Sequence, residues 1–469
     1  MKMHIGGAWV DRDDRIEVRN PFDGTVIDTV PRASADDVET ALATAVEGAR
    51  LMAQMSAYRR YQILHRASEL MTERNEDLGR TITLEEGKII AEGRTEAARA
   101  TETIVLSAEE AKRLTGETFG LDAAGHGAGK FGFTLRVPCG VVVAITPFNF
   151  PMNLVCHKVG PALAAGNAVI LKPATDTPLS ALKLTEILLE AGVPPQALQV
   201  LTGSGGAIGD RLCADPRVRK ISFTGSRDVG EHIVRTAGLK RVTMELGSNS
   251  PLVVMADADI EKAATATAAG GYANAGQVCI STQRVLVAAP VYDDFIAALK
   301  PKVEALTTGN PMDETVKVGP MIRVEDATRV GQWIADAVAQ GARLVTGGQR
   351  QGALHAPTIV ADVAPGMRIS CDELFGPAVA LTRFSALDEA IALANSTNYG
   401  LSAALFTRDL DAAMRFAQQV DSGNIHINWS TVWRADMMPY GGLKESGMGK
   451  EGPKYAIQEM TELKLVIVH

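Results

Sequence analysis

Short apolar runs alternate with helical stretches from about residue 139 onward, and this alternation restricts the fold more than any other feature of the chain. The runs are Val141–Ile145, Ala168–Leu171, Leu198–Leu201, Lys220–Phe223 and Val242–Met244. Strands that are apolar throughout and alternate with helices are typical of buried parallel sheets. The sequence therefore predicts an α/β fold with a doubly wound sheet. A second α/β region follows over about 247–435, with strands near 251–255 and 285–288.

Length, charge and cysteine usage narrow the class of protein. A chain of 469 residues is too long for one ordinary core and favours two or three domains. The net charge is −8 with both signs interspersed, which argues against a nucleic-acid or membrane-surface partner. The five cysteines are scattered without a C-x-x-C pair, so reduced thiols are expected rather than a disulfide framework or a metal site. The N-terminus lacks an apolar signal core, and the sequence predicts a cytoplasmic protein.

Three motifs carry candidate chemistry. Cys279 ends a Gly-Gln-Val-Cys turn, Glu245 opens a Glu-Leu-Gly turn, and Asn149 is central to Pro-Phe-Asn-Phe-Pro. A thiol nucleophile and a carboxylate base are the parts that a covalent thioester mechanism needs. Each residue also has a plainer interpretation, because cysteine packs as a small hydrophobe and asparagine is common in turns beside proline. A lone glutamate is commonly solvated or caps a helix, but the joint occurrence of the three argues against three separate structural roles.

In this order the motifs resemble those of the aldehyde dehydrogenase superfamily, and the resemblance covers nearly the whole chain. It implies two doubly wound α/β domains, a Rossmann-like cofactor domain and a catalytic domain, plus a β-hairpin oligomerisation arm. The expected division is 1–118, 138–246 and 437–454 for the NAD(P)-binding domain, 247–436 for the catalytic domain, and 119–137 with 455–469 for the arm. An exposed terminal strand favours pairing between subunits, so a homodimer or homotetramer is expected.

The resemblance also implies a mechanism. Cys279 would attack the aldehyde, and the Asn149 amide with the Cys279 backbone N–H would hold the oxyanion. Glu245 would activate the water that hydrolyses the thioester, and no metal is required. Because relatives that transfer the acyl group to coenzyme A generally lack this glutamate, water is the expected acceptor.

The cofactor implied by the resemblance is NAD or NADP. Lys172 would bind the adenosine ribose, the Gly225-Ser226 turn at a helix start the diphosphate, and Glu373 the nicotinamide ribose. The full set of expected cofactor residues is Thr146, Phe148, Lys172, Gly205, Gly209, Phe223, Gly225, Ser226, Val229, Leu246, Glu373 and Phe375. Taken singly, Lys172 is equally a solvated lysine and Ser226 a simple helix N-cap. Thr175 stands where many NAD-preferring members carry glutamate, so the choice between NAD and NADP stays open.

Phe150, His157, Val278 and Arg434 are the expected substrate residues. A helix beginning near Asn149 would place Phe150 and His157 on one face. His157 would hydrogen-bond a substrate hydroxyl or acid group, or serve as a satisfied structural histidine.

The loop 428–442 resembles that of lactaldehyde- and phosphonoacetaldehyde-type members. In that group Arg434 would receive an anion, or instead pair with Asp436 or Glu445.

The predicted function is NAD(P)+-dependent oxidation of a short, polar, lactaldehyde-like aldehyde to its acid. The alternatives are a dehydrogenase for an anionic aldehyde (succinate semialdehyde, phosphonoacetaldehyde or sulfoacetaldehyde), a coenzyme A-acylating relative, and a non-catalytic binding protein of the same fold. Fold alone does not decide among them.

Overall fold

The first sheet has eight strands in the order β2-β1-β9-β8-β7-β10-β11-β21. The computed structural model describes residues 1–469, apart from the side chain of Ala207. The strands are β1 (Met3–Ile5), β2 (Ala8–Val10), β7 (Val141–Ile145), β8 (Ala168–Lys172), β9 (Leu198–Val200), β10 (Val218–Thr224), β11 (Arg241–Glu245) and β21 (Gly447–Met448). Strands β7 to β11 run parallel, whereas β1 and β21 join antiparallel. The predicted doubly wound sheet is confirmed.

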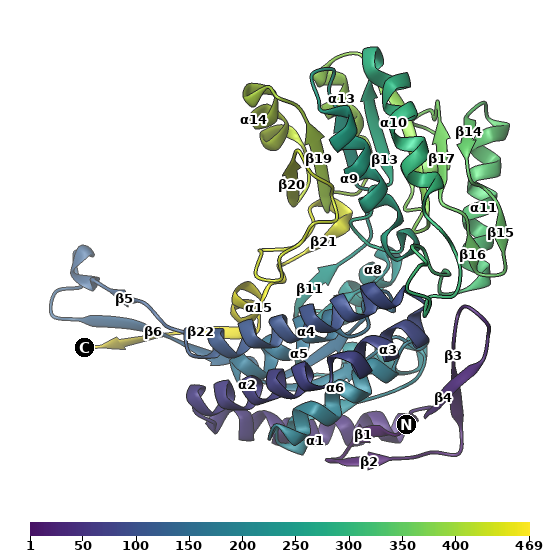
Figure 1. Cartoon of the computed structure of the whole chain (residues 1–469). Helices are drawn as coiled ribbons and strands as arrows, with labels where there is room; N and C mark the ends of the chain where they lie inside the picture. Colours follow the sequence, from purple (N-terminus) through teal and green to yellow (C-terminus); the bar gives the residue numbers. More distant parts are fainter.

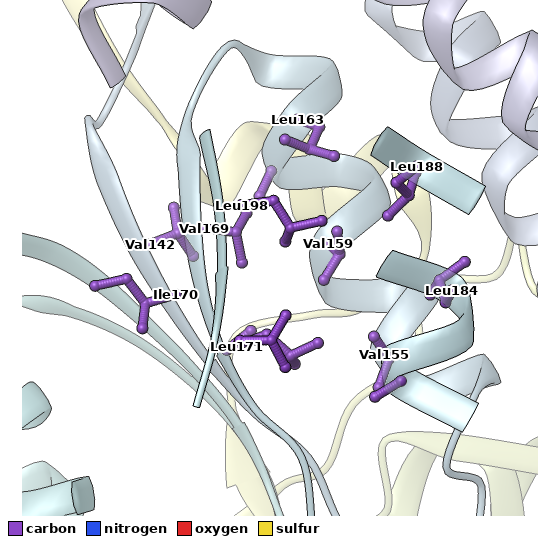
Figure 2. Close-up of a cluster of buried hydrophobic side chains, with 14 of the residues drawn as sticks. Val142, Val155, Val159, Leu163, Val169, Ile170, Leu171, Leu184, Leu188 and Leu198 are labelled. Carbon is purple, nitrogen blue, oxygen red and sulfur yellow. The ribbon is translucent and has the colours of Figure 1, made fainter. Parts of the chain in front are cut away.

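Helices α5 (Asn153–Ala165) and α6 (Leu179–Glu190) cover this sheet. In Figure 2, Val155, Val159 and Leu163 of α5 lie against strand side chains such as Val169 and Leu171. Full burial of such a side chain contributes about 1.5–3 kcal/mol. The apolar strands seen in the sequence therefore form the largest core of the molecule.

The N-terminal helices are α1 (Ala35–Gln54), α2 (Ala57–Glu73), α3 (Asn75–Glu86) and α4 (Ile90–Ala111). The helical pattern that the sequence shows from Tyr58 to about Leu84 corresponds to two helices, because the chain turns at Arg74 between α2 and α3. No glycine or proline marks that turn in the sequence. Gly87, with a φ of 92°, ends α3 in a left-handed conformation.

The second sheet has seven strands in the order β14-β17-β18-β13-β12-β19-β20. They are β12 (Pro251–Val254), β13 (Arg284–Ala288), β14 (Arg343–Thr346), β17 (Thr358–Ala361), β18 (Ala378–Phe384), β19 (Ser402–Phe406) and β20 (Asn424–Ile427). Its helices are α9 (Ile260–Tyr272), α10 (Tyr292–Glu304), α11 (Val324–Ala339), α12 (Arg368–Cys371), α13 (Leu387–Asn395) and α14 (Leu410–Gln419). The strands predicted near 251–255 and 285–288 are confirmed as β12 and β13. Figure 1 shows this sheet in the upper lobe and the first sheet in the lower one.

A three-stranded sheet extends from the lower lobe as an arm, with the C-terminus at its tip (Figure 1). It consists of β5 (Thr118–Phe119), β6 (Phe131–Pro138) and β22 (Thr461–Val468). Strand β22 pairs antiparallel with β6 along its whole length, so the predicted terminal strand is confirmed. Helix α15 (Pro453–Glu459) precedes β22 and packs on α4 and α5, so residues 455–459 lie on the lower lobe and not in the arm.

Smaller elements complete the chain. They are helices α7 (Gly205–Ala214) and α8 (Arg227–Ala237), the hairpins β3 (Arg15–Arg19) with β4 (Val26–Pro31) and β15 (Arg350–Gln351) with β16 (Leu354–His355), and the short helices η1 (Leu121–Ala123), η2 (Pro195–Ala197), η3 (Ala273–Gly276), η4 (Ala289–Val291) and η5 (Lys444–Ser446).

Candidate active site

A cavity of about 710 Å³ lies at the carboxyl edge of the first sheet and is also lined by residues of the upper lobe. Strand β7 delivers Thr146, β8 ends at Lys172, β10 leads into Gly225, and β11 ends at Glu245. Open α/β sheets bind ligands at this edge. All of the expected cofactor residues line the cavity, together with Asn149, Glu245 and Cys279.

A sharp turn presents Cys279 to the cavity. Asn274 and Ala275 have φ values of 49° and 52°, and Gly276 follows at 71°. A Cβ on Gly276 would lie 2.1 Å from the Gly376 carbonyl oxygen, so only glycine fits there. Cys279 lies between the short helix η3, which precedes it, and strand β13, which follows.

Cys279 is half-buried, and its neighbours are apolar side chains and the Tyr440 hydroxyl. Its Sγ lies 3.0 Å from the hydroxyl oxygen of Tyr440. Burial raises the pKa of Cys279 to about 12, while the Tyr440 hydrogen bond and the charge of Arg434 act in the opposite direction. The nucleophilic form is the thiolate, so these opposing contacts bear directly on reactivity.

Both the side chain and the backbone carbonyl of Asn149 form hydrogen bonds. Its Nδ2 donates to the Gln277 carbonyl oxygen at 2.8 Å, which leaves the second amide hydrogen available. Its own carbonyl accepts from Lys88 Nζ at 2.7 Å and from Asn274 Nδ2 at 3.2 Å. The side-chain donor is therefore fixed in a turn that also contacts the cysteine turn.

Glu245 ends β11 with its side chain 2% exposed. Neither carboxylate oxygen has a hydrogen-bond partner among the residues that the structure describes. Burial raises the pKa of Glu245 well above its usual range, and the charge of Glu451 adds to the rise. Glu451 in turn pairs with Lys158 at 2.7 Å. A carboxylate with a raised pKa is a stronger base, as proton abstraction from water requires.

The remaining cavity wall fits a dinucleotide. Ser226 caps α8 (Arg227–Ala237) without a side-chain hydrogen bond to that helix, and Thr146 Oγ1 is buried without a partner in the described part of the chain. Both hydroxyls and the first N–H groups of α8 are thus available for ribose or phosphate oxygens. A Cβ at Gly205 or Gly209 would meet no described atom within 4 Å, so these positions face open space.

Charged and aromatic groups complete that wall. Burial lowers the pKa of Lys172 to about 8, and its Nζ bonds only the adjacent Pro173 carbonyl among described atoms. Glu373 accepts the Ser248 N–H at 2.8 Å, and burial raises the pKa of Glu373 to about 7. Phe148 and Phe375 meet edge to face, with ring centroids 5.9 Å apart.

Two of the expected substrate residues are near Cys279. Phe150 and Val278 belong with Tyr440 to a small apolar cluster around the thiol. The helix expected to begin near Asn149 was wrong, because α5 starts at Asn153 and Phe150 lies in the preceding turn.

His157 and Arg434 are not among the described residues that line the cavity, and they contact each other. His157 Nε2 is 2.9 Å from Asp436 Oδ1 and 3.1 Å from Arg434 Nη2. Both pairings proposed for Arg434 were wrong, because its ion-pair partner is Glu451 at 3.3 Å. Asp436 instead binds Arg99, at 2.8 Å, and Glu445 binds Arg227, at 2.9 Å.

Several residues at the site were not anticipated from the sequence. Tyr440 contacts Cys279, Lys88 contacts Asn149, and Trp333 lines the cavity. Lys158 and Glu451 form an ion pair whose charges act on Glu245. Tyr440 lies in the loop 428–442, whose resemblance to other dehydrogenases pointed to Arg434 and not to Tyr440.

Within the described residues, no cluster of three His, Cys, Asp or Glu side chains could hold a metal ion. None of the helices there combines the length and apolar character needed to cross a membrane.

A largely parallel sheet with a cavity at its carboxyl edge is the arrangement in which open α/β proteins bind nucleotide cofactors. The sequence model of the aldehyde dehydrogenase family matches residues 9–466, and the chain belongs to this family.

Individual relatives agree over their full lengths. The chain is 46% identical to a 3-sulfolactaldehyde dehydrogenase of Priestia megaterium, covering 100% of this chain and 98% of the relative. It is 38% identical to a lactaldehyde dehydrogenase of Methanococcus aeolicus, covering 100% of both. The crystal structure of aldehyde dehydrogenase 21 from Physcomitrella patens, in complex with the reaction product succinate, superposes with a TM-score of 0.97 at 38% identity, covering 100% of this chain and 98% of that one. The chain is thus an NAD(P)-dependent aldehyde dehydrogenase with the fold expected from its sequence.

Proposed function

We propose that the enzyme oxidises a short polar aldehyde to its carboxylic acid through a thioester on Cys279, which Glu245 helps to hydrolyse. The observation that carries this proposal is the convergence of Cys279, Asn149 and Glu245, from three distant segments, on the cavity that the cofactor residues line. A non-catalytic protein has no need for that convergence.

The chain's own groups account for each step. The Cys279 thiolate forms a bond to the aldehyde carbon while the carbonyl π bond breaks, and the available Asn149 N–H stabilises the oxyanion. Bound NAD(P)+ supplies the hydride acceptor for oxidation to the thioester. Glu245 then takes a proton from water as the water oxygen attacks the thioester carbon. The C–S bond breaks, which releases the acid and restores the thiolate.

We favour an aldehyde that carries an anionic group and a hydroxyl, as 3-sulfolactaldehyde does. The 46% identical relative has that substrate in its name. Arg434 acts on the Cys279 thiol by its charge and lies over the Tyr440 ring, and its buried Nε lacks a partner in the described structure. A guanidinium N–H suits a sulfonate or carboxylate oxygen.

A neutral hydroxyaldehyde such as lactaldehyde is the second candidate. Glu451 already balances the charge of Arg434, which weakens its attraction for a substrate anion. A relative named lactaldehyde dehydrogenase also aligns over its full length.

The division into a cofactor domain, a catalytic domain and an arm remains our proposal for this chain, as does association into a homodimer or homotetramer. Exposed apolar side chains at Leu463, Leu465 and Ile467 along β22 support pairing through the arm. The five free cysteines support a cytoplasmic location.

The test is reduced-nicotinamide formation across neutral and anionic short aldehydes, with wild type, Cys279→Ser and Arg434→Gln compared. Loss of turnover in Cys279→Ser supports the mechanism, and turnover that survives in this variant would refute it. A preference for anionic aldehydes that disappears in Arg434→Gln supports the anionic substrate. Equal effects of Arg434→Gln on all aldehydes would favour the neutral substrate. Product release that requires coenzyme A would contradict hydrolysis.

A further inference from the structure

The loop after β20 brings one hydroxyl group to the nucleophile. The Tyr440 hydroxyl oxygen lies 3.0 Å from Cys279 Sγ, and the Tyr440 side chain is 2% exposed. Two backbone hydrogen bonds fix the loop at Tyr440. The Glu451 N–H donates to the Tyr440 carbonyl oxygen at 2.7 Å, and the Tyr440 N–H donates to the Met438 carbonyl oxygen at 2.8 Å. These backbone hydrogen bonds fix the residue whose side chain carries the hydroxyl.

The other surroundings of Cys279 disfavour a thiolate. Its apolar neighbours include Val278, Ile280 and Leu401, which offer no side-chain donor. The charged groups that act on the thiol are Glu245 and Glu373, which disfavour the thiolate, and Arg434, which favours it. A charge-assisted hydrogen bond is the strongest local compensation available at short range.

Arg434 lies behind the Tyr440 ring. Its guanidinium carbon is 3.8 Å from the ring centroid, and its Nη2 is anchored by Glu451 and His157. A cation over a phenol ring withdraws electron density from it and strengthens the hydroxyl as a donor. Arg434 thus acts on the thiol in two ways, through the Tyr440 ring and directly by its positive charge.

We propose that Tyr440 is a catalytic residue whose hydroxyl donates a hydrogen bond to the Cys279 thiolate, and that Arg434 is the positioning residue that holds and polarises the Tyr440 ring. Between these two groups the proton stays on the phenol, which is the weaker acid in water. When sulfur attacks the aldehyde carbon, the sulfur lone pair becomes the C–S bond and the hydrogen bond from Tyr440 is released. No proton leaves the tyrosine.

This inference rests on the proposed role of Cys279, and its test is therefore made without substrate. The rate of Cys279 alkylation by iodoacetamide is measured against pH in the full-length enzyme, by mass spectrometry of the Cys279 peptide. In Tyr440→Phe the apparent pKa of alkylation rises by about one unit, and the rate at neutral pH falls about tenfold. Cys139 and Cys371, which are half-buried elsewhere, serve as internal references whose profiles stay unchanged.

Two further comparisons separate this role from a structural one. Tyr272→Phe removes another buried hydroxyl, which donates to the Thr358 carbonyl, and leaves the Cys279 profile unchanged. Arg434→Met shifts the profile in the same direction as Tyr440→Phe, while Arg434→Lys restores part of the shift.

An unaltered alkylation profile in Tyr440→Phe would overturn the proposal, even if turnover falls. Turnover of wild type and Cys279→Ser is measured separately, so failure of the thioester mechanism would be recognised independently.

Discussion

Glu96 Oε2 lies 2.6 Å from Lys88 Nζ, and both side chains are 1% exposed. Glu96 also accepts the N–H groups of Met152 and Asn153 at 2.9 and 3.1 Å, while Lys88 donates to the Asn149 carbonyl. One buried ion pair therefore connects helix α4 to the turn that carries Asn149 and to the start of α5. The backbone of Asn149, the proposed oxyanion donor, thus depends on a charge 61 residues earlier in the chain.

Glu96→Gln will leave Lys88 buried without its countercharge and lower the free energy of unfolding by about 3–5 kcal/mol. The measurement is denaturant or thermal unfolding together with kcat. Glu76→Gln, which removes the exposed partner of Arg94, is the matched control and will leave both unchanged. Wild-type stability in Glu96→Gln would contradict the supporting role of this pair.

Glu245→Gln will separate oxidation from hydrolysis. Stopped-flow traces will show a stoichiometric burst of reduced nicotinamide, followed by a steady-state rate at least about 100-fold below wild type, because the thioester forms but no base activates water. Glu445→Gln, in a half-exposed pair with Arg227, will behave as wild type. Loss of the burst itself would place Glu245 before hydride transfer.

Thr175→Glu will test how the cavity selects its dinucleotide. Thr175 lines the cavity with Lys172 and donates to the Gly203 carbonyl at 3.0 Å. A carboxylate there will repel a 2′-phosphate and raise the Kd for NADP+ about tenfold, with little change for NAD+. Fluorescence titration measures both constants, and Thr175→Gln controls for size. Equal weakening of both cofactors would contradict a role in phosphate selection.

Glu451 will contribute to acid sensitivity. Although burial opposes ionisation, the charges of Lys158 and Arg434 lower the pKa of Glu451 to about 2. A depressed folded-state pKa stabilises the protein above the unfolded value, and this stabilisation is lost as pH falls from about 4.5 toward 2. Thermal unfolding will be measured from about pH 5.5 to about pH 3. The greater stability of wild type over Glu451→Gln will shrink as the pH falls through this range. A constant difference across that range would refute the assignment.

Leu465→Asp will test association through the arm. Leu465 is 56% exposed on the same face of β22 as Leu463 and Ile467. An aspartate there will shift the enzyme to smaller species in light scattering after size exclusion. Lys464→Asp places the same charge on the opposite face and will leave the assembly intact. Unchanged assembly in Leu465→Asp would exclude that face from the interface.

Features encoded by local sequence were predictable. The capping box of Ser34 and Asp37, the strands β12 and β13 and the terminal strand β22 all follow from residues within a few positions of one another. The turns at Cys279, Asn149 and Glu245 were identified by the same short-range patterns, and the structure brings them to one cavity.

Contacts between distant segments were not predictable. Tyr440 meets Cys279 across 161 positions, and Lys88 meets Asn149 across 61. The sequence identifies Arg434 as a charged residue in a loop, but its pairing with Glu451 depends on how the Tyr440 loop folds back along residue 451. Which charges pair depends on which side chains are buried together. The spacing of apolar residues along the sequence does not show this.

The pairing of β6 with β22 also sets an order of events during synthesis. Pro138 and Thr461 are partners in the ladder although the ribosome makes them 323 residues apart (461 − 138). At about 5–20 residues per second, β6 waits roughly 16–65 s for its main partner strand. During that interval the lower lobe can form its strands β7 to β11, but β6 exposes an unpaired edge beside Phe131 and Leu135. A nascent chain on the ribosome therefore cannot complete its arm until its last strand has emerged.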